Sequence, residues 1–223
     1  MTASRNFDLS GFDALNVTTG IRAIVTTGSP HSLRIEARDD ETIDRLDVSV
    51  AGGRLHIGYF RNFIDFIFSG GFMDLLRFGG DLGVVAYVAV PALNGAEASS
   101  GGRIEVSNVK SDRFRAEASS GGEVSVLGFA GGDVRGMVSS GGRLELEGVA
   151  TELDAAASSG GILRGDRLQS QRGRLDASSG GRIEAAVSTR LRAAASSGGY
   201  IDITGNPSDR DVNASSGGNV SFH

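Results

Sequence analysis

The sequence contains no cysteine and no run of 18 apolar residues, and Lys110 is the single lysine among its 22 basic residues. Without cysteine the chain has no disulfide bond and no thiol chemistry. The lack of a long apolar run argues against a membrane-spanning helix. The first ten residues lack the apolar core of a signal peptide. A net charge of −5 argues against nucleic-acid binding, which favours a basic surface. An envelope location and a cytoplasmic one both fit these absences.

The sequence also lacks the residue patterns of common active sites. His31, His56 and His223 have no metal-ligand spacing, and no cysteine can complete such a site. No G-x-S-x-G nucleophile motif and no phosphate-binding P-loop occurs. We therefore predict no enzymatic activity, no metal and no cofactor.

One column of acidic residues could supply a carbohydrate-cleaving pair, because such enzymes use two carboxylates. The column is interleaved with Ser125 and Arg164 and flanked by further arginines, which favours a charge-balanced sheet face. Its acidic members are Glu105, Glu145, Glu184 and Asp202.

The most informative feature present is a pentapeptide, A-S-S-G-G or a near copy, which occurs seven times in the last 125 residues. Its successive spacings are 18 to 20 residues, and a fixed period of that length indicates a solenoid with one structural unit per repeat. The serine pairs begin at Ser99, Ser119, Ser139, Ser158, Ser178, Ser196 and Ser215.

Apolar residues alternate with polar ones on both sides of each serine pair, which is typical of half-buried strands. After the glycines the second residue is always aliphatic, and before the serines small residues recur at every other position. We interpret each repeat as one three-sided coil of a parallel β-helix, with seven coils over residues 94–223. A third apolar column is expected midway through the coils, at Val109, Phe129, Val149, Leu168 and Val187.

The S-S-G-G segment is interpreted as a structural corner, because glycine allows positive φ and close backbone approach. Its serine hydroxyls can bond neighbouring backbone or a serine one coil away. The alternative is a serine array that presents hydroxyls to a ligand or to ice. The corner residues singled out are Ser99, Gly101, Ser119, Gly121, Ser139, Gly141, Ser178 and Gly180.

Residues 1–93 form a separate, β-rich part that we expect to begin the solenoid or to cap its first coil. Strands are predicted at 14–18, 21–27, 32–37, 46–51, 54–59 and 84–90, with one helical turn within 39–46. Ala51-Gly52-Gly53 reads as a hairpin turn.

A Phe-rich insertion at 58–80 interrupts this part. It is interpreted either as a cap over the solenoid or as a contact with a partner, a second copy or a membrane surface. The contact residues would be Phe60, Phe63, Phe66, Phe68 and Phe72. The last coil would leave an open strand edge, and natural proteins cover such edges. We therefore predict at least a dimer, through this stretch or through the edge.

The order of elements resembles the bacterial head-GIN domain family of auto-transporter adhesins. The resemblance rests on F-D-A-L-N-V at 12–17, T-G-S-P-H-S-L-R-I-E-A at 27–37, D-R-L-D-V-S-V-A-G-G-R-L-H-I at 44–57 and V-P-A-L at 90–93, followed directly by the S-G-G repeats. It implies a right-handed parallel β-helix, an envelope or surface location and no enzymatic activity.

The leading functional hypothesis is a non-enzymatic cell-envelope or surface protein whose solenoid presents a surface for adhesion or assembly, with a protein or glycan surface as partner. The alternatives are a carbohydrate-binding or carbohydrate-processing β-helix and an ice-binding solenoid. A groove with clustered acids would favour sugar, and an exposed Phe patch would favour a protein or lipid partner.

Overall fold

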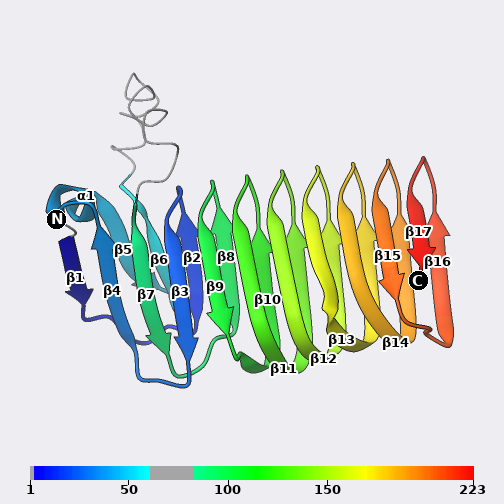
Figure 1. Cartoon of the computed structure of the whole chain (residues 1–223), viewed down its shortest axis with the longest axis horizontal. Coiled ribbons are helices and arrows are strands. Elements are labelled where there is room, and N and C mark those ends of the chain that lie inside the picture. Colours follow the sequence, from blue (N-terminus) through cyan, green and yellow to red (C-terminus); the bar gives the residue numbers. More distant parts are fainter. Residues whose placement is uncertain (1–2, 61–82) are drawn as a thin grey trace.

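The computed structural model describes residues 3–60 and 83–223, and these form an elongated β-solenoid in which strands stack coil upon coil along one axis (Figure 1). Within the described ranges the one helix is α1 (Asp40–Asp44), and nearly all other regular structure is strand. Neighbouring coils pair in parallel. The prediction of an all-β parallel solenoid is confirmed.

Each coil contributes one strand before the S-S-G-G turn and one strand after it. We call the two resulting layers the pre-turn sheet and the post-turn sheet. Four long strands supply both layers by running around the corner between them: β11 (Glu123–Val138), β12 (Arg143–Ala157), β13 (Ile162–Ala177) and β14 (Arg182–Ala195). The shorter pre-turn strands are β8 (Gly95–Ser99), β10 (Lys110–Ala118) and β16 (Asp209–Ala214), and the shorter post-turn strands are β9 (Arg103–Ser107), β15 (Tyr200–Thr204) and β17 (Asn219–Phe222).

The N-terminal part both begins and caps the solenoid. Strands β2 (Ala14–Thr18) and β3 (Arg22–Thr27) form a coil that pairs in parallel with β8 and β9. Strands β6 (Arg54–Tyr59) and β7 (Val85–Val90) stack on the other side of that coil, so chain order and spatial order differ here. Antiparallel strands then finish each sheet: β4 (Ser32–Ala37) and β1 (Ala3–Phe7) on the post-turn sheet, and β5 (Leu46–Ala51) on the pre-turn sheet.

The predicted N-terminal strands are all present, whereas β1 was not predicted. Its sequence A-S-R-N-F is mostly polar, and its burial pattern shows no fully buried residue. An edge strand of this kind is held by its backbone ladder with β4 and carries little hydrophobic alternation to detect.

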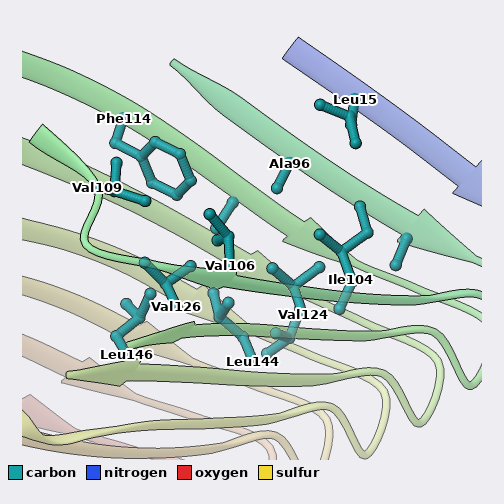
Figure 2. Packing of buried hydrophobic residues seen from close by; sticks show 14 of the residues in the cluster. Leu15, Ala96, Ile104, Val106, Val109, Phe114, Val124, Val126, Leu144 and Leu146 are labelled. Carbon is teal, nitrogen blue, oxygen red and sulfur yellow. The ribbon is translucent and has the colours of Figure 1, made fainter. Parts of the chain in front are cut away.

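The core lies between the two sheets and is built from stacked aliphatic columns (Figure 2). The second residue after the glycine pair is buried in each of the first six S-S-G-G repeats, at 1% exposure or less. Strand register places these residues directly above one another. They are Ile104, Val124, Leu144, Leu163, Ile183 and Ile201.

The prediction of a third buried apolar column is wrong at Val149, which is 60% exposed. Register pairs Phe129 with Gly148, and Gly148 adopts φ +131°. The physical reason is that this coil is one residue shorter at the corner, so Val149 turns outward and Ala150 is buried instead. The column is irregular further on as well, because Val187 pairs with Ser170 and not with Leu168.

The helix α1 begins with a side-chain cap at Asp39. The Asp39 carboxylate accepts hydrogen bonds from the Thr42 backbone N–H at 2.8 Å and the Thr42 hydroxyl at 2.6 Å. These bonds, with a third from Arg38, lower the pKa of Asp39 from 3.8 to about 2.

Because the folded-state pKa of Asp39 is depressed, its stabilising contribution is present above about pH 4 and is lost as the pH falls toward 2. We therefore expect Asp39→Ala to lower stability at pH 7 and the difference from wild type to shrink between pH 4 and pH 2. Urea unfolding at pH 7, 4, 3 and 2 measures this. A difference that stays constant over that range would contradict the assigned cap.

Candidate binding surface

The S-S-G-G segments form sharp turns along one long edge of the solenoid (Figure 1). In each turn the second serine and the first glycine have positive φ, for example +50° at Ser140 and +72° at Gly141. The N–H of Gly142 donates to the carbonyl of Ser139 at 2.9 Å. Two central residues with positive φ and this hydrogen bond are the features of a type I′ turn. The same geometry holds at the predicted corner residues Ser99, Gly101, Ser119, Gly121, Ser178 and Gly180.

The last glycine of each turn is required by close packing against the preceding coil and not by a positive φ. A Cβ on Gly142 would lie 2.4 Å from the carbonyl oxygen of Ala118 in the preceding coil. The turns also bond to one another, since the N–H of Gly121 donates to the carbonyl of Ser140 at 3.2 Å. The turn edge is therefore a continuous stack that leaves no room for a side chain at this position.

One further turn of this kind is T-T-G at 18–20. Thr19 and Gly20 have φ +57° and +69°, and the N–H of Ile21 donates to the carbonyl of Thr18. This turn was not predicted as a copy of the repeat. The signal was present, because a hydroxyl pair and a glycine precede the alternating residues 22–27.

The serine hydroxyls of the seven S-S-G-G turns make no hydrogen bond within residues 3–60 and 83–223, although the sequence suggested bonds to neighbouring backbone or to a serine one coil away. In the T-T-G turn the Thr19 hydroxyl donates to the Thr18 hydroxyl at 3.3 Å. The first serine of each pair is half-buried in the first six turns, and the second is exposed in all seven. Two parallel rows of hydroxyls therefore run along the turn edge and are available to a partner molecule.

The outer face of the post-turn sheet is balanced in charge. Register confirms the acidic column with Ser125 and Arg164 between its members. Each acid in it has an arginine partner: Glu105 bonds Arg22 at 2.8 Å and Asp202 bonds Arg182 at 3.0 Å, while Arg167 bonds Glu145 and Arg182 also contacts Glu184. A hydrogen bond from the Ser221 hydroxyl is the main cause that lowers the pKa of Asp202. A glycosidase acid needs a raised pKa, so this arrangement favours the structural interpretation.

On the same face Arg103 lies 3.5 Å from Glu123, and Glu123 is in register with Arg143. We expect Glu123→Arg to place three arginines in one column and to lower stability by about 0.2–1 kcal/mol, because exposed pairs contribute little. The loss should be larger at 20 mM than at 500 mM NaCl. Urea unfolding at the two salt concentrations measures it, and equal losses would contradict a charge ladder.

The outer face of the pre-turn sheet carries a furrow parallel to the solenoid axis. Its floor is the column next to the turn serines, which in successive middle coils holds Met137, Ala156, Asp176 and Ala194. Three of these four side chains are small or flexible, and Asp176 is acidic. One wall is the row of first turn serines. The other wall is a column of longer side chains: Arg115, Arg135, Asp154, Arg174, Arg192 and Asp211. We call this feature the axial furrow.

Three hollows follow one another along the axial furrow and share lining residues. The first hollow, of about 130 Å³, is lined by Arg54, Glu97 and Glu117. The second, of about 320 Å³, is also lined by Glu97 and Glu117. The second extends past Ser119, Ser139, Ser158 and Ser178 to Asp176. Asp176 also lines the third, of about 250 Å³. The furrow therefore crosses the coils from β8 to β16.

The predicted Phe-rich contact lies almost wholly outside the described residues, which applies to Phe63, Phe66, Phe68 and Phe72. Phe60 is described and is 51% exposed. The insertion connects β6 to β7. In the neighbouring coil, the equivalent connection, from β2 to β3, is the T-T-G turn. Its role as a contact stays a prediction.

The edge formed by β16 and β17 has no further coil stacked on it in the described part of the chain. Val212, which the alternation placed inside, is 42% exposed for this reason. Arg210 occupies an inward position in register with Leu191, and its guanidinium lies 4.5 Å from the ring centroid of Phe222. An inward charge on an edge strand discourages pairing with another chain. Self-association through this edge stays a prediction.

Residues 3–60 and 83–223 contain no group of three or more His, Cys, Asp or Glu side chains that could hold a metal ion. No helix in the same ranges is long and apolar enough to cross a membrane.

Stacked parallel coils joined by ordered turns define the class of β-solenoid proteins. A family model described as "Putative auto-transporter adhesin, head GIN domain" matches residues 11–207, so the chain belongs to that family. No curated protein sequence matches the chain significantly.

Solved structures share this fold at low sequence identity. A putative adhesin from Bacteroides fragilis has a TM-score of 0.83 at 17% identity, covering 100% of this chain and 97% of that one. A putative lipid binding protein from Parabacteroides distasonis has a TM-score of 0.69 at 16% identity, with coverage of 100% and 96%. A putative adhesin from Parabacteroides merdae has a TM-score of 0.60 at 13% identity, again with coverage of 100% and 96%. The family and two of these three neighbours are named as adhesins and not as enzymes.

Proposed function

We propose that the chain is a non-enzymatic binding module of the cell envelope or surface that holds a linear polysaccharide lengthwise in the axial furrow. The observation that carries the proposal is the continuity of the three hollows along the solenoid axis. The adhesin description of the family supports a surface role.

The chemistry of the furrow suits a sugar polymer. Its walls present hydroxyls from the turn serines and charged groups from the opposite column. The floor of the middle hollow includes Met137, Ala156 and Asp176. Because the walls repeat once per coil, a polymer with repeating units can make the same weak contact several times. Repeated contacts on one rigid scaffold raise the overall affinity without any single strong site.

A blocking substitution tests the proposal. Ala156 is exposed on the furrow floor, so Ala156→Tyr should fill the middle hollow without disturbing the core. Ser125→Tyr is the matched control, since Ser125 has an outward position on the opposite sheet. Binding is measured on an array of immobilised linear polysaccharides, neutral and acidic.

We expect the wild type and Ser125→Tyr to bind the same polysaccharide within about twofold of each other. Ala156→Tyr should bind it at least tenfold more weakly. Absence of wild-type binding across the array, or equal binding by both variants, would overturn the proposal.

A further inference from the structure

Arginines on adjacent coils face each other at two places in the wall of the axial furrow, Arg115 with Arg135 and Arg174 with Arg192. Like charges directly opposite one another in neighbouring strands destabilise a sheet, so such pairs need compensation. Among the described residues, register places two arginines opposite each other four times. The four pairs are Arg22 with Arg103, Arg115 with Arg135, Arg172 with Arg190, and Arg174 with Arg192.

Three of the four pairs are compensated by carboxylates of the protein itself. Arg22 and Arg103 bond Glu105 and Glu123 at 2.8 and 3.5 Å. In the other two compensated pairs, Arg115 bonds Glu117, Arg135 lies 3.8 Å from Asp154, Arg172 lies 2.9 Å from Glu152, and Arg190 lies 2.7 Å from Asp209.

The fourth pair, Arg174 and Arg192, is different. Within residues 3–60 and 83–223 neither side chain forms an ion pair or a hydrogen bond, and both are exposed. Arg172 and Arg190 lie two residues away on the same strands and the same face, so four guanidinium groups gather on two adjacent coils. Arg172 and Arg190 have carboxylate partners, so Arg174 and Arg192 are the two of the four without an ion pair in the described residues.

Both arginines line the third hollow of the axial furrow, together with Asp176, Asp211 and Asn213. Asp211 is in register with Arg192 but forms no ion pair with it in the described part of the chain. The hollow thus combines carboxylate and amide oxygens with two guanidinium groups that have no ion pair in the described residues. The planar guanidinium groups suit an oxyanion bound in a bidentate manner, and the oxygens suit ligand hydroxyl groups that donate hydrogen bonds.

We propose that this hollow is a subsite for a sugar carboxylate, so that the ligand of the furrow is an acidic polysaccharide built from uronate units. The inference rests on the proposed function. A uronate carries the carboxylate that bridges Arg174 and Arg192 and the hydroxyls that donate to Asp176 and Asp211. A free inorganic anion satisfies the arginines alone and gains nothing from the two acids. A lipid surface needs exposed apolar side chains beside the arginines. Here Leu175 and Ala193 are buried, and the other lining residues are Asp176, Ala194, Asp211 and Asn213.

The test uses the whole chain of 223 residues and two polymers with the same backbone: polygalacturonate, and its methyl ester, in which each carboxylate is converted to an uncharged ester. The variant is Arg174→Gln/Arg192→Gln. The matched control is Arg103→Gln/Arg143→Gln, which removes the same charge from exposed positions on the post-turn sheet. Affinity is measured by titration calorimetry at fixed salt concentration.

We expect the wild type and the control to bind polygalacturonate equally within about twofold, and the ester at least tenfold more weakly. The furrow variant should bind polygalacturonate at least tenfold more weakly than wild type. Arg174→Lys/Arg192→Lys should be intermediate, because lysine keeps the charge but loses the fork. Without polymer, the furrow variant should melt at the same temperature as wild type or higher, since repulsion is removed, which separates loss of binding from loss of folding.

The outcomes distinguish this inference from the proposed function. Equal binding of both polymers, with no effect of Arg174→Gln/Arg192→Gln, overturns the uronate subsite and leaves polysaccharide binding intact. Binding of neither polymer, nor of any other on the array, overturns both. Binding of phosphatidylglycerol vesicles but not polygalacturonate, lost in the furrow variant, also overturns the subsite, in favour of a lipid headgroup.

Discussion

Leu144→Ala is expected to destabilise the protein by about 2–5 kcal/mol, the range for a buried leucine truncated in a packed core. Leu144 is 1% exposed and lies in register between Val124 and Leu163 in the aliphatic stack of the core (Figure 2). Because each coil contacts mainly its neighbours, the cavity should weaken the adjacent coils as well. Urea unfolding followed by circular dichroism gives the loss.

The control for this prediction is Val149→Ala. Val149 belongs to the same coil but is 60% exposed, so its truncation should change stability by no more than about 0.5 kcal/mol. Equal effects of the two substitutions would contradict the assignment of the inward columns.

Gly142→Ala is expected to destabilise the protein by about 3 kcal/mol, at the upper end of the usual range for overpacking. The added Cβ would lie 2.4 Å from the carbonyl oxygen of Ala118, and the backbone there is fixed by the ladder between coils. The turn edge would have to open at that coil to accommodate the methyl group.

Gly141→Ala provides the comparison within the same turn. A Cβ on Gly141 meets nothing within 4 Å, so the cost is that of an alanine at φ +72°, about 1–2 kcal/mol. Gly141→Asn should cost less, because asparagine tolerates this conformation. Thermal unfolding of the three variants should rank Gly142→Ala as the least stable. A milder effect for Gly142→Ala than for Gly141→Ala would show that the turns are not tightly stacked.

The solenoid could be predicted because its determinants are local and repeat with the chain. The spacing of the serine pairs sets the coil length, and alternation around them sets which side chains face inward. The same reasoning failed at Val149 because one coil is shorter at the corner. Only the register of the neighbouring strands shows that Gly148, and not Val149, lies opposite Phe129. The stacking of β6 and β7 outside β2 and β3 was equally hidden, since alternation does not encode the order of coils.

The axial furrow is a property of side-chain size across columns, and a part of it was visible in the sequence. The column two residues before the first serine of each pair contains Met137, Ala156 and Ala194 together with the acids Glu97, Glu117 and Asp176. The column two residues further back carries mostly arginine and aspartate. The uncompensated state of Arg174 and Arg192 was not visible. Their register follows from the repeat, but whether an acid reaches them depends on side-chain positions.

The methyl group of Met137 gives the most direct test of the claim that a ligand lies along the pre-turn sheet. Met137 lines the middle hollow, and the chain has three methionines, so its resonance can be assigned readily in protein labelled with ¹³C-methyl methionine and alanine. On titration with short polygalacturonate, the resonances of Met137, Ala156 and Ala194 should shift and saturate together, whereas that of Ala130, exposed at the corner between the sheets, should not move. Shifts confined to Ala130, or saturable binding that leaves Met137, Ala156 and Ala194 unchanged, would contradict binding in the axial furrow.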